Sequence, residues 1–182
     1  MDEMLFRELI DAHGLLKSDA AASLPLQPSF LVFAQPANAR IDIAAWRVHA
    51  KRFFATDIGL SADKRYPDGA PTADAANIVL SGPKGAGTRL CLATPRSDGD
   101  LVLAERADAC SPTAGSGLAD LARRCPTVWR VEAVGDDDAL SLTLTAILAS
   151  ILLGPIVSVD GRSLFGVRTA REKLDRLTAP YR

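Results

Sequence analysis

PIVSVDGRSLFGV, residues 155–167, predicts a β-hairpin close to the C-terminus. Two short apolar runs flank Asp160-Gly161, a dipeptide that readily adopts the positive φ angles of a two-residue turn. Thr169 and Glu172 follow with the spacing of a capping box, which marks the first turn of a helix. We therefore expect a strand, a tight turn, a second strand and a helix, in this order.

Length and composition indicate one globular domain over residues 1–182. Hydrophobic residues make up 48% and charged residues 24%, which is typical of a chain that buries its own core. The net charge of −1 argues against a nucleic-acid partner, because such proteins carry a basic surplus. Residues 162–182 are a local exception: five arginines and one lysine against two acidic residues give +4. We interpret these cations as a solvated helix face.

An uncharged segment, residues 139–159, has to be tested as a membrane span, because its 21 residues are long enough to cross a bilayer. Gly154-Pro155 interrupts it, and hydroxyl side chains dilute it at Ser141, Thr143, Thr145, Ser150 and Ser158. We therefore expect a buried helix that ends near Leu153 and runs into a strand, and no membrane span. Leucine alternates with serine or threonine over 140–145, which would also suit a strand. The three aspartates at 136–138 are good helix caps and favour a helix.

The cysteines and the N-terminus bear on the cellular compartment. Cys91, Cys110 and Cys125 lack the spacing of a disulfide framework or a metal site, so we expect reduced thiols, no metal and no cofactor. Residues 1–10 are acidic and amphipathic, unlike a secretory signal, which favours a cytoplasmic location. Abundant alanine and a preference for arginine over lysine suggest a bacterial source.

The remaining pattern predicts an α+β fold. Apolar runs and alternation predict strands at 29–34, 77–81, 88–94, 100–106 and 128–134. Amphipathic spacing predicts helices at 2–17, 43–55 and 116–124, the second of them capped by Asp42. We expect a single domain with a mixed, largely antiparallel sheet of about six strands and helices packed on one face.

The glycine-rich segment 82–87 follows an apolar strand, as a phosphate-binding loop does. Thr88 and Arg89 stand where a P-loop has lysine and then serine or threonine, and a strand continues after them. We therefore predict a hairpin connection that binds no nucleotide. An anion site formed by Lys84 and Arg89 is the alternative.

His49 is the histidine best placed for chemistry, three residues after Trp46 at the edge of an apolar stripe. We interpret it as a half-packed boundary residue. The alternative is a general base that activates Cys110, although nothing in the sequence brings the two together.

Two long connections, 57–76 and 107–115, are the expected location of any binding site. The candidates for ligand contact are Lys64, Arg65, Tyr66 and Asp68 in the first connection and Cys110 and Ser111 in the second, with Asp108 and Thr113 beside them. Arg65 is the best candidate for an anionic group, since a guanidinium can bind two oxygens. Two solvated loops on unrelated surfaces are the alternative.

Three functions are compatible with the sequence. The first is a non-catalytic bacterial cytoplasmic protein, either an accessory subunit or a binder of a small anionic ligand. The second is an enzyme that acts on a small polar or anionic substrate. The third is a homo-oligomeric or membrane-peripheral protein that uses residues 139–159.

Overall fold

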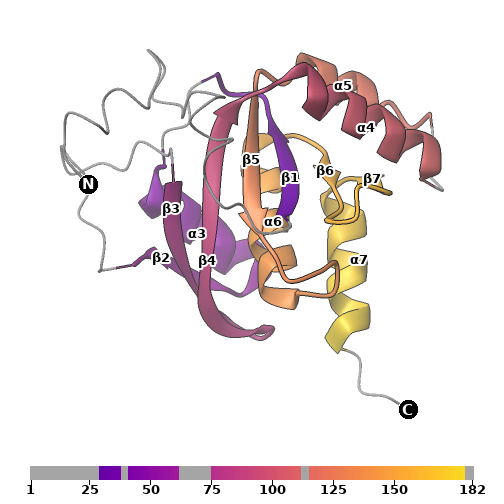
Figure 1. Cartoon of the computed structure of the whole chain (residues 1–182). Helices are drawn as coiled ribbons and strands as arrows, with labels where there is room; N and C mark the ends of the chain where they lie inside the picture. The colour runs from indigo at the N-terminus through magenta and orange to yellow at the C-terminus, as the bar shows by residue number, and fades with distance from the viewer. Residues whose placement is uncertain (1–28, 38–40, 62–74, 112–114, 179–182) are drawn as a thin grey trace.

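One antiparallel sheet joins strands from both ends of the described chain (Figure 1). The computed structural model describes residues 29–37, 41–61, 75–111 and 115–178. Along the sheet the strand order is β2-β3-β4-β5-β1-β6-β7. The strands are β1 (Ser29–Ala34), β2 (Asp57–Leu60), β3 (Ala75–Gly82), β4 (Gly85–Pro95), β5 (Thr127–Glu132), β6 (Ile156–Val157) and β7 (Leu164–Phe165). The predicted α+β class is confirmed, and every strand pair is antiparallel.

Helices cover both faces of this sheet, whereas the sequence predicts them on one face. The main face carries α3 (Ile43–Phe54), α6 (Ala139–Leu152) and α7 (Val167–Thr178), and the opposite face carries α4 (Asp98–Cys110) and α5 (Leu118–Arg124). The central strand β1 explains the difference. Phe30 and Val32 enter the main core, while Leu31 and Phe33 enter a second core under α4 and α5. A continuous apolar run of this kind is typical of a strand buried on both faces.

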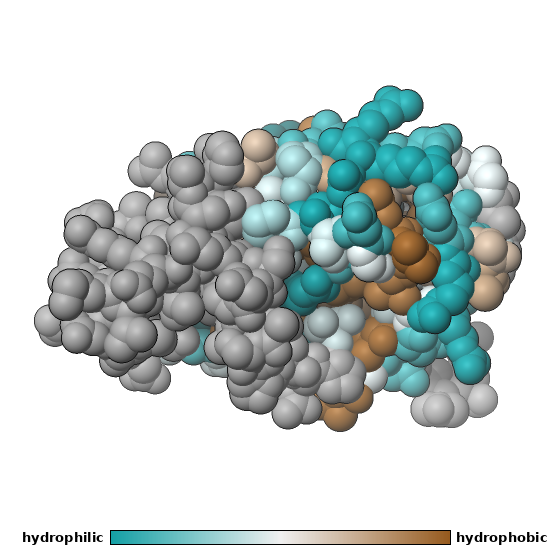
Figure 2. Space-filling model, turned by 45° about the horizontal axis from the view of Figure 1, so that its top comes forward, coloured by the Kyte–Doolittle hydropathy of each residue, from teal (hydrophilic) through white to brown (hydrophobic). Residues whose placement is uncertain are grey.

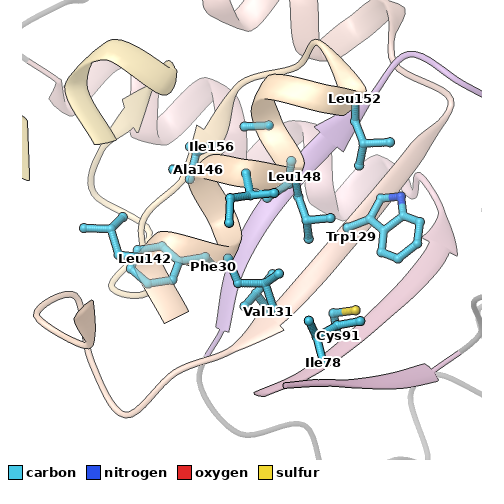
Figure 3. Close-up of a cluster of buried hydrophobic side chains, with 14 of the residues drawn as sticks. Phe30, Ile78, Cys91, Trp129, Val131, Leu142, Ala146, Leu148, Leu152 and Ile156 are labelled. Atoms are coloured by element: carbon cyan, nitrogen blue, oxygen red, sulfur yellow. The ribbon is translucent and has the colours of Figure 1, made fainter. Parts of the chain in front are cut away.

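The main core lies between α6 and the sheet. Figure 3 shows Leu148 and Leu152 of α6 close to Trp129 of β5. Trp129 also meets Trp46 of α3 edge to face, with the ring centroids 5.5 Å apart. Aromatic pairs in this geometry stabilise a core beyond the area they bury.

Helix α6 confirms the predicted buried helix. Asp138 caps it by accepting a hydrogen bond from the Ser141 amide. The hydroxyls that dilute the segment are satisfied inside the core: Thr143 donates to the Ala139 carbonyl at 2.6 Å and Thr145 to the Ser141 carbonyl at 2.7 Å. No described helix combines the length and apolar character that a bilayer crossing requires.

The predicted strand at 100–106 is wrong, because these residues belong to α4. Ser97 and Asp100 form a capping box: the Asp100 amide donates to the Ser97 hydroxyl at 3.2 Å, and the Ser97 amide donates to the Asp100 carboxylate at 2.9 Å. Ala104 and Ala107 are buried one helical turn apart. Arg130 of β5 lies 2.7 Å from the Asp100 carboxylate and ties the start of the helix to the sheet.

The C-terminal hairpin is confirmed, but its turn is wider than two residues. Ile156 pairs with Phe165 and Val157 with Leu164, which leaves residues 158–163 in the connection. The Gly161 amide donates to the Ser158 carbonyl, so Val159 and Asp160 occupy the centre of the turn and Gly161 follows at φ +67°. The Ser158 hydroxyl accepts from the amides of residues 162 and 163, which stabilises this longer loop.

The capping box predicted for Thr169 and Glu172 does not form. Helix α7 begins two residues earlier, and Glu172 instead pairs with Arg168, one turn before it, at 3.1 Å. The predicted helix at 2–17 lies outside the described residues. The connection predicted over 57–76 begins with β2 and ends inside β3, while its central part, 62–74, also lies outside them.

Candidate functional site

The residues predicted to contact a ligand are only partly described. Lys64, Arg65, Tyr66 and Asp68 lie outside the described residues, as does Thr113. Cys110 is exposed at the end of α4, and Ser111 is buried, its hydroxyl donating to the Leu164 carbonyl of β7 at 3.4 Å. Asp108 accepts a hydrogen bond from the Gly115 amide.

The described ends of the two connections lie far apart along the sheet. Ser61 follows β2 at one edge, whereas Ser111 packs against β7 at the other. A cleft shared by the two connections therefore finds no support in their described ends.

The glycine-rich segment is a hairpin, as expected. Gly82 pairs with Gly85, and the long strand β4 follows. Lys84 reaches α7, where its ammonium lies 3.1 Å from the Leu174 carbonyl. Arg89 donates to Asp138 at 2.8 Å and to the Ser141 hydroxyl at 2.7 Å. Both cations have partners within the fold, which weakens the case for an anion site here.

The cysteines do not form a site with His49. Burial raises the pKa of Cys91 to about 12 and that of Cys125 to about 11, so both remain protonated thiols at neutral pH. Cys110 ends α4 on one face of the sheet, while His49 belongs to α3 on the other. Among the described residues no cluster of three or more His, Cys, Asp or Glu side chains could hold a metal.

His49 instead meets a serine and two phenylalanines. Its Nε2 lies 2.9 Å from the Ser150 hydroxyl of α6. Its ring centroid is 4.7 Å from that of Phe53 and 6.3 Å from that of Phe54. Helix α6 packs against both α3 and α7, and Figure 1 shows it between them, so His49 faces the junction of three helices.

Two arginines from separate helices border this histidine. The guanidinium of Arg52 lies 5.0 Å from the ring centroid of Phe53, and that of Arg171, in α7, lies 4.5 Å from the ring centroid of Phe54. Arg171 also donates to the Phe53 carbonyl at 3.2 Å, which joins α7 to the end of α3. Within the described part of the chain, no carboxylate pairs with either arginine.

We refer to this region as the α3–α7 basic surface, formed by His49, Arg52, Phe53, Phe54, Ser150 and Arg171. Each guanidinium lies over a phenylalanine ring, and Arg171 also uses one N–H group to bind the Phe53 carbonyl. The remaining N–H groups of the two arginines are the ones that would bind a ligand. Other arginines of α3 and α7 do have carboxylate partners: Arg47 pairs with Asp57 and Arg168 with Glu172.

The electrostatics of the surface favour an anion. Burial lowers the pKa of His49, and the charges of Arg171 and Arg52 lower it further. The imidazole is therefore neutral at neutral pH, and a positive charge placed on it would be repelled by two cations. A bound anion would offset that repulsion.

Only part of this surface is predictable from the sequence. The sequence indicates His49 as a residue of interest, but as a boundary residue or a base for Cys110. The signal for Arg171 is the excess of positive charge over 162–182, which by itself predicts only a solvated helix face. Nothing in the sequence indicated that Arg52 and Arg171 would border the same histidine.

Apolar side chains that reach solvent are dispersed over several elements. Figure 2 shows hydrophilic residues over much of the described part of one face, with smaller apolar areas between them. The most exposed apolar residues lie in different elements: Val48 in α3, Val102 in α4, Val134 after β5 and Leu153 after α6. Ten residues of α6 are buried, so this helix offers no continuous apolar surface to a second copy or to a membrane.

Comparison with protein-family models, with curated protein sequences and with solved structures finds no match to this chain.

Proposed function

We propose that this is a non-catalytic binding protein whose ligand carries an anionic group, and that Arg52 and Arg171 bind that group. The observation that carries the proposal is the pair of arginines from separate helices, each with its guanidinium over a phenylalanine ring and neither paired with a described carboxylate. Holding the side chains in place before the ligand arrives reduces the entropy lost on binding. The composition-based expectation of a bacterial cytoplasmic protein remains part of this proposal.

Binding fits the charges around His49 better than catalysis does. The 2.9 Å contact between His49 and Ser150 resembles a base and its nucleophile, which is the observation in favour of the enzyme alternative. A general base becomes an imidazolium during the reaction, and a nearby carboxylate ordinarily stabilises it. Here the charges that act on His49 are those of Arg171 and Arg52, which oppose the imidazolium.

Sulfate provides a direct test, because it is a small dianion that a guanidinium pair can bind. Binding would be followed through amide chemical shifts in an NMR titration of the wild-type protein and of Arg52→Gln and Arg171→Gln. Losing one charged hydrogen bond costs about 1.5–3 kcal/mol, so each variant should bind sulfate at least about tenfold more weakly. Arg124→Gln is the matched control, an exposed arginine in α5 on the other face of the sheet.

Saturable binding that is weakened by both substitutions in α3 and α7, and not by the control, would support the proposal. Equal binding in all four proteins, or no saturable binding in any of them, would contradict it. An esterase activity that disappears in Ser150→Ala would favour the enzyme alternative instead.

A further inference from the structure

Building on the proposed function, we propose that His49 is a third anion-binding group of the α3–α7 basic surface and takes up a proton when the anion binds. His49 is half-buried at the junction of α3 and α6, beside an arginine on its own helix and an arginine on α7.

The charged groups that face His49 come from two of the three helices. Arg52 lies one turn further along α3, and Arg171 approaches from α7 through its contacts with Phe53 and Phe54. Helix α6 contributes the Ser150 hydroxyl and has no ionisable residue along its length. The charge state of His49 is therefore governed by its burial, by the two arginines and by whatever they bind.

The hydrogen bond to Ser150 is compatible with both protonation states. A neutral imidazole can accept a hydrogen bond from the Ser150 hydroxyl through Nε2, while an imidazolium donates Nε2–H to the same oxygen. In that neutral form Nδ1 already carries a hydrogen, so protonation adds a positive charge to the ring and turns Nε2 from an acceptor into a donor. Neither change requires the contact between α3 and α6 to break.

A bound anion changes the electrostatic potential at the His49 ring. Its negative charge offsets the two guanidinium charges and so raises the pKa of His49 above its value in the free protein. Thermodynamic linkage requires the converse: if the anion promotes protonation of His49, protonation strengthens anion binding by the same factor. The affinity for the anion should therefore increase as the pH falls through the titration range of His49.

Sulfate is the suitable probe, because its charge stays constant over the range in which histidine titrates. We would measure sulfate affinity from about pH 8 to about pH 5 for the wild-type protein, His49→Gln and His13→Gln. Wild-type affinity should rise about tenfold, the factor that corresponds to a pKa increase of about one unit. His49→Gln, which keeps a hydrogen-bonding group without the charge, should show no rise, and His13→Gln should behave like the wild-type protein.

A second measurement does not depend on changing His49. The chain has two histidines, so in His13→Gln the remaining imidazole signal belongs to His49 and can be titrated by NMR with and without sulfate. Sulfate should raise the pKa of this histidine. Circular dichroism would check that each variant is folded.

The outcomes separate the two proposals. Arginine-dependent sulfate binding with the same pH profile in wild type and His49→Gln would overturn the role of His49 and leave the proposed function intact. Absence of saturable sulfate binding at every pH would overturn both. A His49 titration curve that sulfate does not move would also refute the coupling.

Discussion

Among the described glycines, Gly154 is the position where one added methyl group should do most damage. It follows α6 and lies directly against β1, so that a Cβ atom there would fall well inside van der Waals contact with the Phe33 carbonyl oxygen and 2.6 Å from its carbon. The obstacle is backbone in the middle of the sheet and cannot rotate away as a side chain could. Two hydrogen bonds hold the segments together: the Phe33 amide donates to the Pro155 carbonyl at 3.0 Å and the Gln35 amide to the Leu152 carbonyl at 3.1 Å.

The cost of Gly154→Ala follows from these contacts. To accept the methyl group, the end of α6 has to move away from β1, which strains or breaks both hydrogen bonds. Overpacking costs about 1–3 kcal/mol and each lost backbone hydrogen bond about 1 kcal/mol, so we expect a loss of roughly 3–5 kcal/mol. Domains are typically stable by only about 5–15 kcal/mol, so this is a large fraction of the total.

Urea unfolding followed by tryptophan fluorescence is the appropriate assay, since Trp46 and Trp129 are both buried in the main core. The substitution should lower the midpoint by roughly 1.5 M or more, given a typical dependence of about 2 kcal/mol per molar urea. Gly59→Ala is the control, because a Cβ atom at that strand position meets nothing within 4 Å, and it should change the stability by less than about 1 kcal/mol. A Gly154→Ala protein as stable as the Gly59→Ala protein would refute the reasoning.

Three further predictions concern other parts of the fold. Gly161→Val should destabilise the protein by more than about 1 kcal/mol in the same assay, because Gly161 has φ +67° and a Cβ would lie 2.9 Å from Leu103; an unchanged midpoint would contradict this. In the native protein at neutral pH one thiol per chain, the exposed Cys110, should react with a maleimide, because burial raises the pKa of the other two; a second fast-reacting thiol would argue against it. Burial raises the pKa of Asp138, but hydrogen bonds from Arg89 and Ser141 outweigh it and leave the pKa below its ordinary 3.8. Asp138→Asn should therefore cost roughly 1–3 kcal/mol at neutral pH, and the difference from wild type should shrink as the pH falls below about 4; a difference that stays constant in acid would exclude the charge as its cause.

The parts of the fold that the sequence predicts well are those where short-range signals agree. For α6, the aspartate cap, the length of the apolar run and the Gly154-Pro155 break all indicate the same boundaries, and the helix forms between them. For α4, the signals conflict: Leu101 and Leu103 alternate as in a strand, while Ser97 and Asp100 form a capping box with aspartate in place of the usual glutamate. The burial of Ala104 and Ala107 against β1 and its neighbours supports the helix, and that burial depends on contacts distant in sequence.

The C-terminal turn differs from its prediction for a similar reason. Asp160-Gly161 has the composition of a two-residue turn, but the Ser158 hydroxyl binds the amides of residues 162 and 163 and closes a longer loop. Competition between a side chain and the backbone for the same amides is decided by the arrangement of the whole loop. The Asp160-Gly161 dipeptide therefore predicts the hairpin correctly, but it does not predict the length of the turn or which residues lie at its centre.

The α3–α7 basic surface could not be predicted because it depends on how two helices face each other. His49 and Ser150 are 101 positions apart, and Arg171 and Phe53 are 118 apart. The positive charge over 162–182 is visible in the sequence, but the basic residues of this segment differ in role: Arg168 pairs with Glu172, and Lys173 lies over Phe165.

The position of Arg171 follows from the way α7 packs on the core. Ala170 and Leu174 are buried one turn apart, so residue 171 emerges beside the buried stripe and reaches the end of α3, where Phe53 and Phe54 accept its guanidinium. A shift of α7 by one residue would carry the same charge away from His49, which is why net charge alone could not locate the site.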